Sequence, residues 1–304
     1  MTKIEWTHGL NGRVGRTWNP VAGCTVISPG CTNCYAMRMA ARINKMTRGS
    51  HYEGLTKIVN GNPVWTGKIA RAPDKIFNAP LKWGKPTRIF VNSMSDLFHD
   101  DMPDEWIDQV FAVMALKPQH TFQILTKRPK RMREYFSNEA TFVRIDIAIA
   151  RADPWPELNE YRLDTWPLPN VWLGVSAEDQ TRAGERIPYL LETPATVRFV
   201  SAEPLLGPLE LWHRESCGDC DPCIGGKAAQ CAVGGYFVGM LGALDWVIVG
   251  GESGPGKRPV DLAWMRSIRD QCQAAGVPLF VKQIDKRIPI PDDLMIRQWP
   301  EGVK

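Results

Sequence analysis

The sequence predicts an α/β fold: a parallel (β/α) barrel, complete or partial and TIM-like, interrupted by two insertions. Two observations lead to this prediction. Short apolar runs rich in β-branched and aromatic residues recur along the 304 residues, and amphipathic segments separate them. Near-continuous apolarity without alternation is typical of parallel strands that are covered on both faces. The hydrophobic content of 44% is enough to fill a large core.

Seven strands are predicted in chain order, each a short apolar run that ends abruptly in polar residues. They are Thr17–Pro20, Arg88–Asn92, Thr121–Leu125, Val171–Val175, Val197–Val200, Trp246–Val249 and Pro278–Val281. About seven repeated strand–helix units favour a barrel over a doubly wound sheet.

Three helices are predicted from apolar residues at helical spacing. Asp104–Leu116 and Asp261–Ala275 both show this period, and Gly276 is the expected stop of the second. Cys272 lies on the apolar face of that helix and is interpreted as a buried small hydrophobe. In the third helix, Tyr35–Met46, four larger side chains are expected to face the core: Tyr35, Met39, Ile43 and Met46.

The predicted barrel domain spans residues 1–283, and 284–304 is expected to be a C-terminal extension that wraps the surface. The first insertion, 49–87, shows little periodicity and is expected to form a flap over the site. The second insertion, 205–243, contains four cysteines.

Composition indicates a cytoplasmic protein. The start, MTKIEWTHGL, lacks the pattern of a secretory signal, and no apolar run approaches the roughly 20 residues of a membrane helix. We therefore expect no membrane partner and reduced cysteines, whose clustering favours metal ligation over disulfides. The formal charge of +4 permits an anionic partner without requiring one.

Three cysteines in the run GCTVISPGCTNCY are the first candidate site: Cys24, Cys31 and Cys34. Three thiolates leave one metal position open for a substrate or cofactor, whereas four close the site. A helix that begins after Cys34 would direct its N–H groups and positive dipole end at the metal. The alternative is a zinc knuckle whose fourth ligand comes from elsewhere, and the spacing does not decide between them.

Polar side chains follow the predicted strands, and in a parallel barrel the carboxyl ends of all strands share one rim. Lys127, His99 and Glu203 are the candidate catalytic residues, with His99 as a proton-transfer group. The candidate cofactor-binding residues are Asn92, Ser93, Asp96, Ser176, Glu178, Ser201, Gly250, Gly251, Glu252 and Lys282. Taken singly, each of these residues is more readily a helix cap or a solvated loop residue than a ligand.

A second cysteine group has the spacing C-x2-C-x2-C-x7-C and comprises Cys217, Cys220, Cys223 and Cys231. It is expected to bind an auxiliary iron–sulfur cluster or a structural zinc ion. The basic run Lys127–Arg133 is either a footprint for nucleic acid or a solvated helix start. Four tryptophans near the first insertion are either nucleobase-stacking groups or packing residues: Trp6, Trp18, Trp65 and Trp83.

Several long strings resemble the bacteriophage-associated three-cysteine-motif family, phage proteins of unknown function considered to be radical S-adenosylmethionine-like. They are the cysteine run and FVNSMSDLFHD, HTFQILTKRP, NVWLGVSAED, FVSAEPLLGPL and DWVIVGGESGP. The resemblance implies a [4Fe–4S] cluster on Cys24, Cys31 and Cys34 that reductively cleaves S-adenosylmethionine (SAM) to a 5′-deoxyadenosyl radical, with an electron donor as partner.

The chain departs from the wider radical SAM pattern in two places. Six residues instead of three separate Cys24 from Cys31, and the Gly-Gly-Glu letters at 250–252 follow a late strand instead of an early one. Asn92–Asp96 is therefore the better candidate for binding the methionine ammonium, and Gly250 and Gly251 are candidates for approaching a carboxylate or phosphate.

The sequence thus predicts a radical SAM enzyme that modifies a nucleoside or a nucleic acid. The alternative is a non-catalytic, zinc-containing nucleic-acid-binding phage protein. This alternative accounts for both cysteine groups and the basic run, and it leaves the polar strand ends unexplained.

Overall fold

The computed structural model describes residues 4–8, 14–152, 165–211 and 240–300. The chain divides into two compact units. The first comprises residues 1–173 and 193–196, and the second comprises 174–192 and 197–304. Strand β8 (Val171–Ser176) begins in the first unit and ends in the second.

The first unit contains the strand order β1-β6-β7-β8, with β1 (Arg16–Trp18), β6 (Arg88–Val91) and β7 (Thr121–Thr126). The pairs β1–β6 and β6–β7 are parallel. These strands confirm the first predicted runs to within two residues, because their β-branched and aromatic side chains are buried almost completely.

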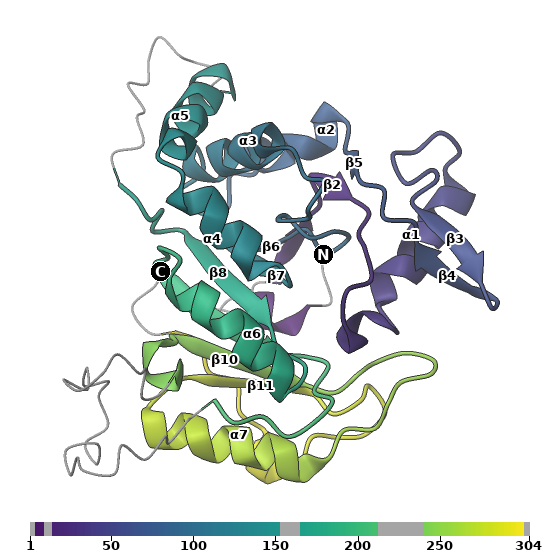
Figure 1. Ribbon diagram of the computed structural model, residues 1–304, viewed down its shortest axis with the longest axis vertical. Coiled ribbons are helices and arrows are strands. Elements are labelled where there is room, and N and C mark those ends of the chain that lie inside the picture. The colour runs from purple at the N-terminus through teal and green to yellow at the C-terminus, as the bar shows by residue number, and fades with distance from the viewer. Residues whose placement is uncertain (1–3, 9–13, 153–164, 212–239, 301–304) are drawn as a thin grey trace. The chain divides into compact units, whose positions relative to one another are not determined.

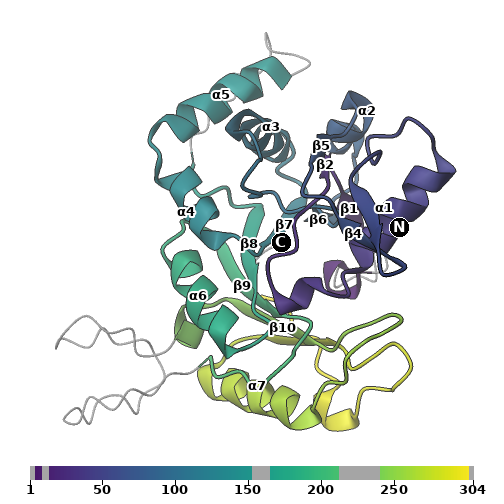
Figure 2. The same cartoon turned by 45° about the vertical axis from the view of Figure 1, so that its right-hand side comes forward.

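Five helices of the first unit are described (Figure 1). They are α1 (Tyr35–Met46), α2 (Asp74–Phe77), α3 (Asp104–Ala115), α4 (Pro129–Ser137) and α5 (Ala140–Ala152). Helix α3 confirms its prediction, and it lies side by side with α5 (Figure 2). Helix α5 was not predicted, and the start of α4 falls in the basic run Lys127–Arg133, for which a helix start was one of two interpretations.

Helix α1 forms where expected, but the face predicted to be buried was wrong. Its buried residues are Ala36, Met37 and Ala40, whereas Tyr35, Met39 and Met46 are 51%, 43% and 73% exposed. Ile43 is half-buried. The reason is that the buried face continues from Cys34 through the residue three positions later, Met37, and then Ala40.

The first insertion contains regular structure. Strands β3 (Thr56–Val59) and β4 (Asn62–Trp65) form an antiparallel hairpin. Its two turn residues, Asn60 and Gly61, both have positive φ, as a type I′ turn requires. Farther along, β5 (Ala70–Arg71) pairs with β2 (Val21–Ala22) just ahead of the cysteine run. The insertion is thereby attached to the segment that carries the thiols.

The second unit contains the strand order β8-β9-β10-β11, with β9 (Val197–Ala202), β10 (Trp246–Gly250) and β11 (Leu279–Gln283). The described pairs β9–β10 and β10–β11 are parallel. Helix α6 (Gln180–Leu191) contacts β9, and α7 (Leu262–Ala275) contacts β10 (Figure 2). Gly276 ends α7 in a left-handed conformation, and Cys272 is buried, both as predicted.

A complete barrel is not confirmed. The outer edge of β11 accepts the C-terminal segment: Val281 N–H donates to the Ile296 carbonyl, and Gln298 N–H donates to the Leu279 carbonyl, both at 2.9 Å. Phe280 and Arg297 form the antiparallel bridge between these two bonds. Because this edge is occupied, β11 ends the strand order, and no pairing with β1 exists among the described residues. The predicted extension is therefore part of the sheet edge.

Residues 212–239 lie outside the described residues, and with them Cys217, Cys220, Cys223 and Cys231. The predictions for that cysteine group stay predictions. Within the described ranges, no helix is long and apolar enough to cross a membrane.

Gly251 is required by packing. A Cβ added there would stand 1.9 Å from the Ile284 carbonyl oxygen, which belongs to the backbone and cannot rotate away. We expect Gly251→Ala to lower the free energy of unfolding by about 1–3 kcal/mol or more. The matched control is Gly184→Ala in α6, where the added methyl meets nothing within 4 Å. That variant should be stabilised by about 0.5–1 kcal/mol. Urea unfolding measures both, and equal stabilities would contradict the close approach.

Candidate functional site

The cysteine run forms a loop between β2 and α1. A 3-10 turn at Pro29–Cys31 folds it back, and Cys34 immediately precedes the first residue of α1. Cys24, Cys31 and Cys34 are all half-buried and none forms a disulfide. The predicted start of a helix after the third cysteine is confirmed.

Backbone and side-chain bonds attach this loop to the loop that follows β6. Gly23 N–H donates to the Met94 carbonyl at 3.0 Å, and Ser95 Oγ donates to the Val21 carbonyl at 3.0 Å. Asn19 Oδ1 accepts from Ser93 Oγ and from Met94 N–H, each at 3.1 Å. The position of Cys24 is thus fixed by the carboxyl ends of two neighbouring strands.

Apolar residues form a wall behind two of the thiols. Cys24 and Cys34 pack against one buried cluster that includes residues of α1 and of the first insertion. Its members are Ala22, Ala36, Met37, Ala40, Tyr52, Leu55, Trp65 and Met94. The insertion expected to be a flap therefore supports the cysteine loop.

Asp96 joins the ends of β6 and β7. Its Oδ1 accepts from Phe98 N–H at 3.0 Å and from Thr126 Oγ1 at 2.7 Å. Its Oδ2 accepts from Lys127 N–H at 2.9 Å and from Arg128 Nη1 at 3.2 Å. A carboxylate has about four acceptor positions, so these donors leave none for a ligand. Asp96 positions the site instead of binding the ammonium suggested by the sequence.

Arg128 reaches from this carboxylate to the first thiol. Its Nε donates to Asp100 Oδ2 at 3.3 Å, and its Nη1 lies 3.9 Å from Cys24 Sγ. The side chain is only 6% exposed. Its remaining nitrogen, Nη2, is buried without a hydrogen-bond partner among the described residues.

His99 is buried and both of its ring nitrogens are engaged. Asp101 N–H donates to Nδ1 at 3.2 Å, which requires a lone pair on Nδ1 and places the proton of the neutral ring on Nε2. Nε2 lies 2.6 Å from the Oγ1 of Thr25, the residue after Cys24. His99 thus holds the cysteine loop, and this geometry does not favour the predicted proton transfer.

Burial dominates the acidity of two thiols. It raises the pKa of Cys24 to about 12, with the Asp96 charge acting in the same direction and Arg128 opposing it. Burial also raises the pKa of Cys34. The backbone N–H groups at Ala36 and Met37 and the Lys127 ammonium oppose this rise. Lys127 therefore lies close enough to Cys34 to act on it electrostatically.

Within the described residues, no group of three or more His, Cys, Asp or Glu side chains surrounds a point where one metal ion could be held. A single tetrahedral ion with bonds of about 2.3 Å needs its sulfurs about 4 Å apart. A cluster of several iron atoms is larger and takes thiolates that are more widely separated. Three thiols on one loop, with Arg128 beside Cys24 and Lys127 near Cys34, are the kind of donor set that an iron–sulfur cluster takes.

Asn92, directly after β6, has a left-handed backbone with φ of 59°, which is uncommon outside glycine. Its side-chain nitrogen and oxygen are both buried without a partner among the described residues. Ser93 next to it is engaged with Asn19. Buried polar atoms without partners are rare, and strained residues gather at functional sites, so Asn92 remains a candidate for binding a ligand.

The predicted residues of the second unit lie at the carboxyl ends of their own strands. Glu203 follows β9 and accepts from Lys282 Nζ of β11 at 2.5 Å. Both side chains keep about a fifth of their surface exposed, at 17% and 21%. A Cβ added at Gly250 would stand 3.3 Å from Glu203 Cδ, so the glycine makes room for this pair.

The two other acidic candidates of this unit are bound to arginines. Glu178 is fully buried and accepts from Arg186 Nη1 at 2.8 Å. Glu252 accepts from Arg258 through the backbone N–H, Nε and Nη2. Gly251 packs its backbone against Ile284, as described above. These residues stabilise the strand ends, and Ser176 and Ser201 are buried beside them.

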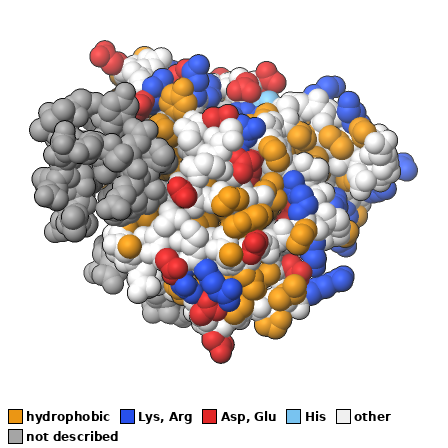
Figure 3. Space-filling view, turned by 60° about the horizontal axis from the view of Figure 1, so that its bottom comes forward, with side chains coloured by type: hydrophobic (Ala, Val, Ile, Leu, Met, Phe, Trp, Pro, Cys, Tyr) orange, Lys and Arg blue, Asp and Glu red, His pale blue; other side chains and the backbone are white. Residues whose placement is uncertain are grey.

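At least three of the five basic side chains in the run Lys127–Arg133 take part in ion pairs, and one of these three, Arg128, is buried. Arg128 pairs with two acids, Arg131 pairs with Asp104, and Lys130 lies 3.9 Å from Glu134 on the next turn of α4. Figure 3 shows basic and acidic side chains interspersed on the face in view. The interpretation of the run as a helix start fits best.

The four tryptophans are packing residues. Each is buried or packed against a neighbouring ring, such as Trp6 against Phe90 at 4.9 Å between centroids. Trp18 is 2% exposed and donates to the Phe77 carbonyl, and Trp65 belongs to the apolar wall. Trp83 lies edge-on to His120.

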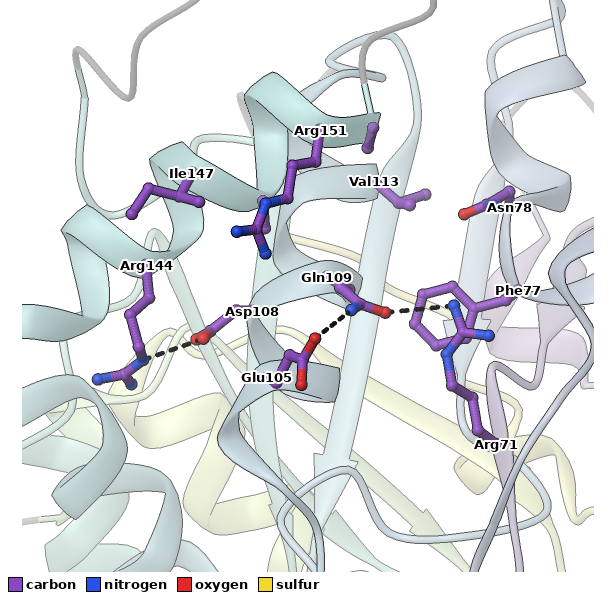
Figure 4. A pocket seen from close by; sticks show the side chains of 12 residues that line it. Arg71, Phe77, Asn78, Glu105, Asp108, Gln109, Val113, Arg144, Ile147 and Arg151 are labelled. Atoms are coloured by element: carbon purple, nitrogen blue, oxygen red, sulfur yellow. Dashed lines mark hydrogen bonds and ion pairs between the residues drawn. The ribbon is translucent and has the colours of Figure 1, made fainter.

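A separate pocket of about 420 Å³ is lined mainly by residues of β5, α2, α3 and α5 (Figure 4). Arg144 donates to Asp108 at 3.0 Å, and Arg71 donates to Gln109 at 3.2 Å. None of the residues predicted for the site lines it, and its arginines are largely paired with neighbouring side chains.

No specific role was predicted for three residues of the site: Thr25, Thr126 and Arg128. Thr126 and Arg128 flank Lys127 in the string LTKRP, which was noticed for its charge. The proline at 129 begins α4, and it was the available signal that Arg128 precedes a helix and need not be solvated.

The model of one protein family, described as a protein of unknown function (DUF5131), matches residues 1–291. No curated protein matches the chain, and no solved structure matches it. The family description gives no activity, so the phage association and the radical chemistry expected from the sequence stay predictions.

Asp96→Asn should destabilise the protein by about 3–5 kcal/mol, because it leaves the buried Arg128 charge poorly compensated and replaces an acceptor of two bonds by a donor. Asp101→Asn is the matched control, since the Asp101 side chain is 77% exposed. That change should stay within about 0.5 kcal/mol. Urea unfolding at neutral pH compares the two, and a small effect at Asp96 would contradict its role as a junction.

Burial and the nearby Arg128 charge lower the pKa of His99. The unfolded chain therefore binds more protons below about pH 6.5, and stability falls as the pH drops through that value. His99→Gln should lose less stability than the wild type between about pH 7.5 and 5.5. Unfolding curves at both pH values test this, and parallel losses would show that His99 does not titrate on unfolding.

Proposed function

The chain belongs to a family of proteins of unknown function (DUF5131), and we propose that it is a radical SAM enzyme with a [4Fe–4S] cluster on Cys24, Cys31 and Cys34. The observation that carries the proposal is the arrangement of these thiols. They form no disulfide, lie on one loop that leads into α1, and have Arg128 beside Cys24 and Lys127 near Cys34.

The charges around the loop favour a negatively charged group bound by thiolates. Lys127 and Arg128 lie near different thiols, and the positive end of the α1 dipole faces Cys34. A bound [4Fe–4S] cluster would supply one electron to SAM, giving methionine and, after hydrogen abstraction, 5′-deoxyadenosine. The chain supplies ligation, orientation and a partly buried setting for that chemistry.

Neighbouring residues have separate proposed roles. Asn92, with two buried unpartnered atoms, is the candidate for holding a polar group of the cofactor. In the second unit, the partly exposed pair of Glu203 and Lys282 is the candidate for proton transfer or for binding a charged group. The expected nucleoside or nucleic-acid substrate and the electron donor stay predictions.

The rival function, a zinc-containing protein that binds nucleic acid without catalysis, has less support. At least three of the five basic side chains in the run that suggested it form ion pairs, with Asp96, Asp100, Asp104 and Glu134. Phosphate-dominated binding would fall steeply as salt rises, which makes the rival directly testable.

Anaerobic reconstitution with iron and sulfide should give a brown protein that converts SAM to methionine and 5′-deoxyadenosine when reduced. The measurement uses a background in which Cys217, Cys220, Cys223 and Cys231 are replaced by serine, so that iron is assigned to the first group. There the protein should bind about four iron atoms. Replacing Cys24, Cys31 or Cys34 by serine should abolish cleavage and most of the iron.

Cys272→Ala is the matched control, because Cys272 is buried on α7 and distant in sequence from the loop. It should keep full iron content and cleavage. Iron-loaded protein that never cleaves SAM would overturn the radical mechanism. Zinc without iron in protein purified without oxygen, together with salt-sensitive binding of nucleic acid, would favour the rival.

A further inference from the structure

Arg128 is held more rigidly than a loop arginine needs to be. Two carboxylates fix it: Asp100 accepts from Nε at 3.3 Å, and Asp96 accepts from Nη1 at 3.2 Å. Asp96 is itself fixed by Thr126 and by two backbone N–H groups. The guanidinium therefore has a defined position before anything binds.

One end of this guanidinium faces the cysteine loop with an unused donor. Nη1 lies 3.9 Å from Cys24 Sγ, and Nη2 is bonded to the same carbon, so it lies at the same end of the group. Nη2 is buried without a partner among the described residues. A buried donor on a charged group is expected to find an acceptor, and a group bound at the cysteine loop, beside Nη1, is a candidate acceptor for Nη2.

We propose that Arg128 is a positioning residue that donates a charge-assisted hydrogen bond from Nη2 to the anionic iron–sulfur group held by the three cysteines. This inference rests on the proposed function, because it needs that group to be present. Sulfur atoms of such a group accept hydrogen bonds, and both these bonds and the net charge nearby set the reduction potential. Arg128 thereby stabilises the reduced, more negative form.

The chain offers a matched pair of variants. Arg128→Gln removes the charge and the planar guanidinium while keeping a polar side chain. Arg131→Gln removes the same charge one helical turn away, where Arg131 is paired with Asp104. Arg128→Lys keeps the charge and loses the planar guanidinium. This variant replaces Arg128→Gln in the experiment if Arg128→Gln does not fold. Circular dichroism verifies the fold of each variant.

The experiment reconstitutes each variant anaerobically with iron and sulfide and measures iron content and reduction potential by a redox titration of the visible absorbance. Arg128→Gln should retain less iron and show a more negative potential than the wild type. Arg128→Lys should shift in the same direction by less, and Arg131→Gln should match the wild type. These readouts do not depend on SAM cleavage.

The failure modes are distinct. If the wild type takes up no iron and sulfide, the proposed function fails and the inference fails with it. If the wild type forms the cluster and every folded Arg128 variant has its potential and iron content unchanged, the inference alone is overturned. An equal shift of the reduction potential in Arg131→Gln also overturns the inference. The shift would then follow from the loss of any nearby positive charge and not from a hydrogen bond of Arg128.

Discussion

The carboxylate of Asp96 is the constraint on which the arrangement of the first unit depends. Its four bonds tie the loop after β6 to the start of the segment after β7, so two strand ends move as one. Breaking a buried, hydrogen-bonded charge pair is costly because the remaining charge stays buried. The same carboxylate orients Arg128, which links this junction to Cys24. Asp96 therefore holds two strand ends together and also orients the arginine that contacts Cys24.

The cysteine loop inherits its position from that junction. The bonds from Gly23 to Met94 and from Ser95 to Val21 attach it to the loop after β6, while the hairpin of the first insertion closes its apolar side. His99 adds a bond to Thr25 from the same loop. Preorganised ligands bind a metal group with less loss of conformational freedom. The six residues between Cys24 and Cys31 are thus compatible with a defined site, because neighbouring loops hold the cysteine loop at several points.

Much of the fold follows from local patterns, whereas the site does not. The seven strands were predictable because their apolar runs are continuous and short, and Gly276 marked the end of α7. The Asn60–Gly61 pair was a hairpin signal that went unused.

The buried face of α1 was mispredicted because side-chain size was taken as the guide, although Cys34 fixes which face turns inward. Arg128 could not be assigned from sequence, because its partners Asp96 and Asp100 are about thirty residues away and a run of charges looks the same whether solvated or buried.

The acidity of the thiols gives a reason for the positive groups around them. With its pKa raised to about 12, Cys24 is a neutral thiol at neutral pH, and ionising it costs on the order of 4 kcal/mol more than for an ordinary cysteine. The Arg128 charge opposes that cost at Cys24 without cancelling it. At Cys34, Lys127 and the backbone N–H groups at the start of α1 oppose the rise in pKa in the same way. Metal binding displaces the protons, and affinity then depends on how much of the thiolate charge the protein already compensates. In the proposed function, a cationic metal would offset this cost at Cys24 and Cys34, and the positive groups beside these two thiols would lower the part that remains.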